Sequence, residues 1–271
     1  MKSINLNRII LSIEDDSALD AFRQAGDERV LSRILTYSDE MYPFSNSLYI
    51  CDTPEGCRKL IEKGYPVAAL LHKNNASESF DHVRYLLQDP EQISLEDYDH
   101  IFRRLSGLPI EILETEHLLL RETTLADLDS FYEMYEDPQI AGFMEPLYSR
   151  DEEEAYQINY INNVYAFYGI GIWTVILKDT DAVIGRIGIE YTDEAGCVEL
   201  GFMIKAANRR MGYAYEACCA IVDYARQTED ITRIRTRVRE DNIPSQNLCT
   251  KLNMIRGKEL NDGLSEWTLD L

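Results

Sequence analysis

An apolar strand that runs directly into a basic loop and then a helix constrains this chain more than any other stretch. Residues 198–204 read Val-Glu-Leu-Gly-Phe-Met-Ile and predict a buried strand, and the helix begins through Gly212. Helix N-termini present unpaired backbone N–H groups and the positive end of the helix dipole. Because Arg209 and Arg210 lie just ahead of this helix, the junction predicts a docking place for a phosphate group.

The spacing Arg209-x-x-Gly212-x-Ala214 after a strand resembles the pyrophosphate-binding loop of the GNAT family of N-acetyltransferases. An ordinary strand-to-helix turn that needs one glycine is the alternative interpretation. A second motif supports the resemblance. Asn242-x-x-Ser245, continuing to Met254, is similar to the family's Asn-x-x-(Ser/Ala) segment with its Lys-x-Gly-Phe ending.

The order of predicted elements also resembles the family. From residue 115 onward the patterns predict a strand, two helices, three antiparallel strands, a helix, a strand, a helix and two closing strands. The resemblance implies an α+β GNAT fold, with a mixed, mostly antiparallel sheet flanked by helices, over residues 115–271. The Glu-Leu-Gly-Phe sequence at 199–202 most resembles the branch with ribosomal-protein-alanine acetyltransferases. That branch also contains enzymes for free amino acids and small amines. The predicted ranges are 117–121, 125–135, 151–164, 172–177, 183–191, 197–204, 212–226, 234–238, 244–252, 255–260 and 265–271.

The first part of the chain predicts a separate unit, an accessory and non-catalytic α/β domain over residues 1–114. A strand at 47–52, a helix capped by Thr53 and a strand at 66–71 form a βαβ unit, which indicates a Rossmann-like parallel sheet. Residues 48–67 faintly resemble a region of haloacid-dehalogenase-like phosphatases, in which Asp52 would be the relic of a metal ligand. The family's Asp-x-Asp nucleophile motif has no counterpart at residues 14–16.

Composition narrows the class of protein. The 271 residues fit two domains, and 45 % hydrophobic residues are enough for a core. A net charge of −21 argues against nucleic acid or an anionic membrane surface as a partner, and it fits attraction of a cationic amine. Without a long apolar run or a signal-peptide pattern, we expect a cytoplasmic protein. The six cysteines contain no Cys-x-x-Cys pair, so no metal site is expected and the thiols should be reduced.

The resemblance implies acetyl-CoA as co-substrate. Its pyrophosphate would lie on the amides of residues 209–214, and its pantetheine arm would run beside residues 202–204 as a pseudo-strand. A backbone N–H near Phe202 or Met203 would polarise the thioester carbonyl. Asn242 would bind the pantetheine or an ordered water, with a helix cap as the alternative. The candidate cofactor-binding residues are Phe202, Met203, Ile204, Arg209, Arg210, Met211, Gly212, Tyr213, Ala214, Asn242 and Ser245.

Glu199 is the first candidate for the general base. It stands in an apolar strand five residues before Ile204, roughly 17 Å from the strand's end, which is comparable to an extended pantetheine arm. The alternative is an ion pair between Glu199 and an arginine across the sheet, such as Arg186 or Arg235. Glu190 and Asp193 are second-rank candidates.

Two further positions complete the predicted catalytic set of Glu199, Asn242 and Cys249. Cys249 falls where many GNAT enzymes place a tyrosine that protonates the leaving thiolate, and cysteine is a poorer donor. Asn253 replaces the family's glycine, and asparagine can adopt the same left-handed conformation.

The leading hypothesis is therefore an N-acetyltransferase that moves an acetyl group from acetyl-CoA to a primary amine in a ternary complex. The acceptor is a small amine, an amino acid or a protein N-terminus, and a homodimer stays open. One alternative is a non-catalytic module that senses acyl-CoA or an amine and signals through the N-terminal domain. The weaker alternative is a phosphatase that uses Asp52.

Overall fold

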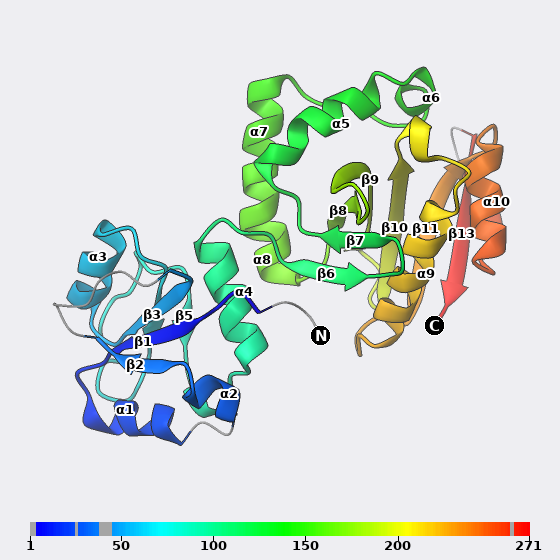
Figure 1. The fold of residues 1–271 in the computed structure, drawn as a ribbon. Helices are drawn as coiled ribbons and strands as arrows, with labels where there is room; N and C mark the ends of the chain where they lie inside the picture. Colours follow the sequence, from blue (N-terminus) through cyan, green and yellow to red (C-terminus); the bar gives the residue numbers. More distant parts are fainter. Residues whose placement is uncertain (1–3, 25–26, 38–44, 261–262) are drawn as a thin grey trace. The chain divides into compact units, whose positions relative to one another are not determined.

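The computed structural model describes residues 4–24, 27–37, 45–260 and 263–271. The chain divides into two compact units, Met1–Ile110 and Glu111–Leu271 (Figure 1). The sequence suggests a boundary after residue 114. The division falls earlier because residues 111–114 form a strand, β6 (Glu111–Glu114), that pairs with the first strand of the second unit.

The first unit is built around a five-stranded sheet whose strands follow the order β2-β1-β3-β4-β5. All four neighbouring pairs run parallel, which confirms the predicted N-terminal parallel sheet. Its elements are β1 (Arg8–Ser12), α1 (Asp16–Arg23), α2 (Glu28–Leu31), β2 (Ile34–Thr36), β3 (Ser47–Cys51), α3 (Pro54–Glu62), β4 (Val67–Leu70), β5 (Leu86–Leu87), η1 (Pro90–Gln92) and α4 (Leu95–Leu105).

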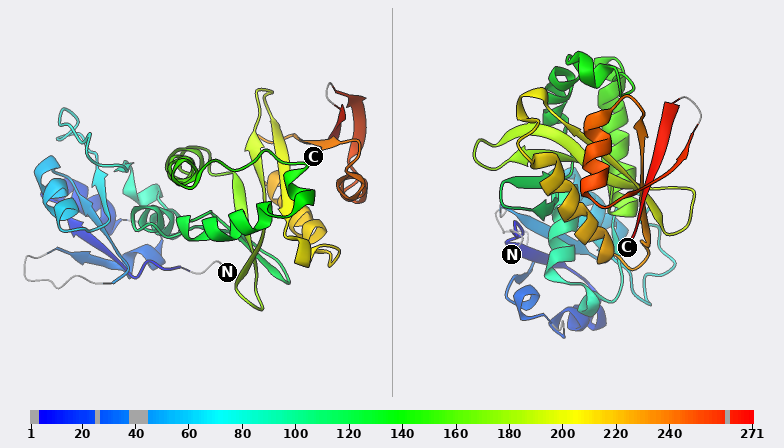
Figure 2. Two further views of the ribbon diagram at one scale, coloured as in Figure 1. Left: turned by 90° about the horizontal axis from the view of Figure 1, so that it is seen from above. Right: turned by 90° about the vertical axis from the view of Figure 1, so that its right-hand side faces the viewer.

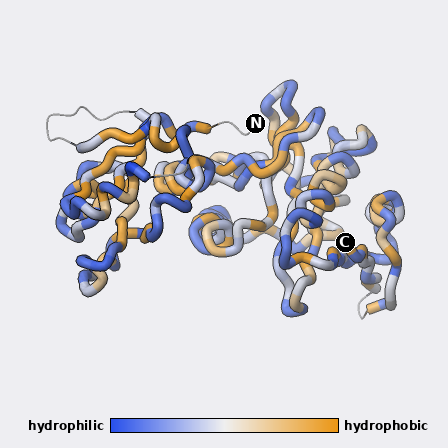
Figure 3. The backbone as a smooth tube through the Cα atoms, turned by 90° about the horizontal axis from the view of Figure 1, so that it is seen from below, coloured by the Kyte–Doolittle hydropathy of each residue, from blue (hydrophilic) through white to orange (hydrophobic). Residues whose placement is uncertain are grey.

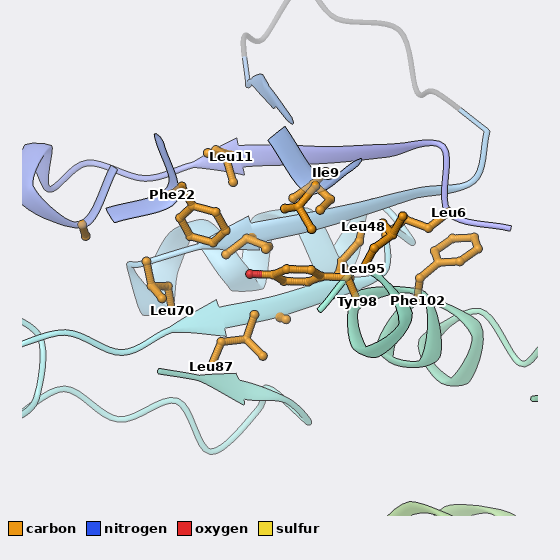
Figure 4. Packing of buried hydrophobic residues seen from close by; sticks show 14 residues of the cluster. Leu6, Ile9, Leu11, Phe22, Leu48, Leu70, Leu87, Leu95, Tyr98 and Phe102 are labelled. Atoms are coloured by element: carbon orange, nitrogen blue, oxygen red, sulfur yellow. The ribbon is translucent and has the colours of Figure 1, made fainter. Parts of the chain in front are cut away.

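Both faces of this sheet are covered, and its strands alternate their side chains between two cores. On one face, Tyr98 and Phe102 of α4 pack with Phe22 of α1 against strand side chains (Figure 4). On the other face, Leu60 of α3 packs with Tyr49 and its neighbours. Burial on both sides explains why β3 and β4 are apolar at nearly every position.

The second unit contains an eight-stranded sheet of order β12-β13-β11-β10-β9-β8-β7-β6. Every neighbouring pair is antiparallel except β10 with β11. Besides β6, its elements are β7 (Leu118–Arg121), η2 (Leu125–Asp127), α5 (Leu128–Tyr135), α6 (Pro138–Ala141), α7 (Arg150–Asn159), η3 (Tyr160–Tyr165), α8 (Ala166–Tyr168), β8 (Ile172–Leu177), β9 (Ala182–Tyr191), β10 (Cys197–Ile204), η4 (Ala206–Asn208), α9 (Tyr213–Arg226), β11 (Arg233–Arg239), α10 (Ile243–Lys251), β12 (Ile255–Glu259) and β13 (Leu264–Asp270). This architecture confirms the predicted fold class.

Helices cover both faces of the second sheet (Figures 1 and 2). Met203 of β10 packs with Leu128 and Phe131 of α5 on one face. Trp173 of β8 is fully buried on the opposite face, where its ring meets Tyr224 of α9 edge to face. Hydrophobic stretches accordingly follow the strands, while hydrophilic ones mark many of the connections (Figure 3).

The predicted helix over 151–164 is interrupted in the structure. α7 ends at Asn159, and the six residues of η3 form a π-helix before α8 continues. π-helical turns insert one extra residue per turn and occur often at functional sites. This turn sets the direction in which Tyr160 and Tyr165 point.

Within the described ranges, the structure contains no helix that is both long and apolar enough to cross a membrane.

Candidate active site

The central feature of the second unit is the separation of β10 from β11. The two strands pair in parallel only from Cys197 opposite Arg233 to Glu199 opposite Arg235. β10 nevertheless continues to Ile204, paired with β9 along its length. β11 continues to Arg239, paired with β13. The gap that begins after Glu199 therefore leaves one edge of β10 without a strand partner, between two strands of the same sheet.

Strand alternation identifies which backbone groups face this gap. The N–H of Lys205 donates to the carbonyl of Ile184 at 2.7 Å, so residue 205 points its backbone toward β9. Because backbone direction alternates along a strand, Phe202 and Ile204 direct their N–H and C=O groups toward the gap. These are the groups that a pantetheine arm needs for strand-like pairing.

The loop after β10 leads to the open N-terminus of α9. Gly212 is the N-cap residue, with φ +93° and no side-chain cap. A Cβ built on it would meet no atom within 4 Å. Arg210 precedes it in a left-handed conformation with φ +63° and is exposed. The first amides of α9 therefore face open space beside a cation, as an anion site requires.

Two other cations of the loop are directed toward α5 instead. The Arg209 Nε donates to the Ile204 carbonyl at 3.0 Å, and its guanidinium lies 2.8 Å from Asp137. The Lys205 ammonium lies 2.5 Å from Glu133 of α5. Arg209 thus fixes the shape of the loop, and Arg210 is the cation left beside the amides of residues 211–214.

Side-chain alternation places Glu199 and Met203 on the sheet face that α5 covers. Glu190 of β9 stands directly opposite Glu199. Between Glu190 and Arg186, the paired glycines Gly188 and Gly201 contribute no side chain. A Cβ on Gly188 would lie 2.0 Å from the Gly171 carbonyl oxygen, so close strand packing explains that glycine.

The two carboxylates of this face have different partners. Glu199 accepts a hydrogen bond from the Nε of Arg235 at 3.2 Å, and Arg237 lies 3.7 Å away. The structure thus contains the ion pair that the sequence left as an alternative, with Arg235 as the partner. Glu190 is exposed and accepts a hydrogen bond from the Tyr160 hydroxyl at 2.5 Å.

Residues of the second motif have structural contacts in α10. The Asn242 side chain caps this helix by accepting from the Ser245 N–H at 3.2 Å, which is the alternative role that the sequence allowed. Cys249 is fully buried, and burial raises the pKa of its thiol to about 12. Asn253 has φ +59°, the left-handed conformation expected there.

Sequence reasoning missed the contribution of Tyr160 and the second arginine, Arg237. In the sequence Tyr160 is one of several tyrosines in or next to a predicted helix, and Tyr165 of the same stretch is a core residue. The register of the β9–β10 hairpin could have identified the two facing carboxylates, because it places Glu190 opposite Glu199.

The first unit shows a structural use for Asp52. This buried carboxylate accepts backbone N–H bonds from Glu14 and Asp15, at 2.9 Å each for the shorter contacts, and lies 3.3 Å from His72. Among the described residues no group of three or more His, Cys, Asp or Glu could hold a metal ion. Asp52 thereby secures the loop after β1. The faint phosphatase resemblance stays a sequence-based prediction.

Comparison with known proteins decides the family. The acetyltransferase (GNAT) domain family matches residues 117–255. The chain belongs to the GNAT acetyltransferase family. It is 30 % identical over 155 residues to the N-acetyltransferase p20 of Bacillus licheniformis, covering 56 % of this chain and 87 % of that protein. These matches establish an acyltransferase enzyme.

Solved GNAT structures share the fold. An acetyltransferase from Agrobacterium tumefaciens superimposes with a TM-score of 0.51 at 22 % identity, covering 60 % of this chain and 95 % of that chain. RimL, a ribosomal L7/L12 alpha-N-protein acetyltransferase solved with coenzyme A, gives a TM-score of 0.51 at 12 % identity, covering 60 % and 98 %.

Proposed function

We propose that this GNAT enzyme transfers the acetyl group of acetyl-CoA to a primary amine by direct attack in a ternary complex. The observation that carries the proposal is the gap between β10 and β11 that leads straight to the uncapped N-terminus of α9. The unpaired edge of β10 matches the amide-containing pantetheine arm of coenzyme A. The backbone amides at the N-terminus of α9 match its pyrophosphate. The coenzyme A complex of RimL supports the same ligand.

In this proposal, the amides of residues 211–214 and the Arg210 guanidinium bind the pyrophosphate. The carbonyl of Phe202 and the N–H of Ile204 pair with the amides of the pantetheine arm, since the Ile204 carbonyl already accepts from Arg209. The N–H of Phe202 polarises the thioester carbonyl, which stabilises the developing oxyanion. Arg209, predicted as a phosphate ligand, instead shapes the loop through Asp137. Cys249 takes no part, because its thiol is buried and its pKa is raised.

The acceptor class proposed is an amine in a small molecule, an amino acid or a protein N-terminus. RimL, which modifies a ribosomal protein at its α-amino group, supports the last of these. Residues 1–114, the accessory domain of this proposal, supply none of the groups named for the chemistry.

The binding half of the proposal is tested at Gly212. We expect isothermal titration to show that Gly212→Glu weakens acetyl-CoA binding by about 100-fold, equivalent to about 2.8 kcal/mol, because a carboxylate then stands on the path of the phosphates. Gly169→Glu is the matched control. Gly169 also has a positive φ, +71°, and an open Cβ direction, but lies after α8. Equal binding by wild type and Gly212→Glu would contradict the loop assignment.

A further inference from the structure

Two carboxylates stand directly across from each other on the sheet face where an amine would meet the thioester. Glu199 and Glu190 are register partners in β10 and β9. Glu199 lies three residues before Phe202, about 10 Å along the strand. Either carboxylate could therefore reach an attacking nitrogen through one water. Their surroundings decide which of them can receive a proton.

The carboxylate of Glu199 forms ion pairs with two arginines. Its Oε2 accepts from Arg235, whose side chain is only 13 % exposed, and lies 3.7 Å from Arg237. Glu199 and Arg235 also form the last register pair before β10 and β11 separate. Arg235 also lies 3.7 Å from the exposed carboxylate of Asp193, but Glu199 is its nearer partner at 3.2 Å. Loss of the Glu199 charge would weaken the pairing of this largely buried guanidinium, which is costly. The ion pair thus serves to hold the strands together where the gap begins.

Glu190 has a neutral partner instead. Within the described part of the chain its carboxylate accepts one side-chain hydrogen bond, from the Tyr160 hydroxyl to Oε1 at 2.5 Å. Its residue is exposed at the end of β9. Oε2 is therefore accessible to water, and no cation of the described residues forms an ion pair with Glu190.

Tyr160 is held in place by its own contacts. Its side chain is buried, its oxygen accepts the Ile172 N–H at 2.9 Å, and its ring packs edge to face on Tyr165 with centroids 5.0 Å apart. Burial, with the nearby Glu190 charge, raises the pKa of the Tyr160 hydroxyl, so it stays protonated and remains a donor. The π-helical turn η3 begins at this residue.

From these contacts we propose that Glu190 is the general base of the acetyl transfer and that Tyr160 is its positioning residue. This inference rests on the proposed function, and it assigns the general base of that same active site. The hydrogen bond to Oε1 fixes the carboxylate rotamer and leaves Oε2 for the water that relays the proton.

The acceptor arrives at the site as an ammonium ion, which must lose one proton before its nitrogen can attack. Glu190 Oε2 takes one proton through a water and releases it to solvent. The neutral nitrogen attacks the thioester carbonyl, a C–N bond forms, and the carbonyl electrons move to oxygen beside the Phe202 N–H. The C–S bond then breaks, and the thiolate of coenzyme A receives the second nitrogen proton. The products are an N-acetyl amide, a free thiol and one released proton.

The test compares Glu190→Gln with Glu199→Gln by thiol release over pH 5–9, with acetyl-CoA binding measured in parallel. We expect Glu190→Gln to lower kcat by about 100-fold or more, to abolish the acid limb of the kcat/KM profile and to bind acetyl-CoA as the wild type does. Glu199→Gln should keep the acid limb. Loss of the limb in Glu199→Gln and its retention in Glu190→Gln would overturn the inference.

Tyr160→Phe tests the positioning role. We expect kcat to fall by about 10-fold while the KM for acetyl-CoA stays unchanged, because the Glu190 carboxylate loses the donor that holds its rotamer. Tyr156→Phe is the matched control, since its ring lies 6.0 Å from that of Tyr160 and the residue is 43 % exposed. An unchanged kcat in Tyr160→Phe, or a rise in KM alone, contradicts the positioning role. A wild type that binds acetyl-CoA but acetylates no amine overturns the proposed function, and this inference with it.

Discussion

At the scale of single residues, what touches a side chain decides its chemistry more than its type does. Glu190 and Glu199 are the same residue at facing positions, yet one meets a tyrosine and the other an arginine. The sequence indicated Glu199 because it stands in an apolar strand. It offered Arg235, 36 residues away, only as an alternative partner beside Arg186, and it could not decide between the ion pair and a free carboxylate.

Cys249 makes a residue-scale prediction that depends on pH. Because burial raises its thiol pKa to about 12, almost no thiolate exists at pH 8, and the side chain is closed to solvent. We expect iodoacetamide at pH 8 to leave Cys249 unmodified in the native protein and to modify it in urea, as read by peptide mass mapping. Native labelling at the unfolded rate would contradict its burial and restore it as a proton donor.

At the scale of elements, the sequence predicts most of the second unit because each signal there is local. The hairpin of β8 and β9, the strand β10 and the turn η2 with its Thr124 capping box, which leads into α5, all follow from periodicity, turns and caps. The first unit was less predictable. Its strand β5 (Leu86–Leu87) has two residues, too few for an alternating pattern to mark it in the sequence. The gap between β10 and β11 and the π-helical turn at Tyr160 depend on contacts between elements, which no local pattern records.

A buried ion pair joins three of these elements. Asp127 of η2 receives two bonds of 2.7 Å from Arg121 of β7, and it accepts from the Thr124 N–H and from Thr174 of β8. Burial alone would raise the pKa of Asp127, but the bonds from Arg121 and Thr124 outweigh it and lower that pKa. The pair therefore stabilises the fold above pH 4 and loses its effect as pH falls through the lowered value.

We expect Asp127→Asn to reduce the free energy of unfolding by about 3–5 kcal/mol at pH 7, because it leaves a buried guanidinium unpaired. The loss should shrink at pH 3, because below its ordinary pKa the Asp127 carboxyl of the unfolded chain binds a proton, while the lowered native pKa delays that binding in the fold. Urea unfolding at pH 7 and at pH 3 measures the difference in the free energy of unfolding between Asp127→Asn and the wild type. Asp129→Asn is the control. The Asp129 side chain is 85 % exposed, so its ion pair with Arg150 should contribute less than about 1 kcal/mol. Similar losses for both variants at pH 7 would contradict the account.

At the scale of the whole molecule, the two units follow different rules. The first is a parallel sheet buried on both faces, and the second is a mostly antiparallel sheet that opens at its only parallel pair in the described structure. That opening gives the second unit its ligand edge. The net charge of −21 favours the approach of an ammonium acceptor, and the amides of α9 supply a local site for anionic coenzyme A.

The most direct test of the central claim is release of free thiol from acetyl-CoA by the 271-residue chain, measured with amines, amino acids and peptides with free N-termini as acceptors. The account predicts thiol release that depends on at least one amine, matched by an acetylated product of the expected mass, and lost in Gly212→Glu. Acetyl-CoA bound tightly, with no acetylated product from any amine class, would contradict a transferase at the β10–β11 gap.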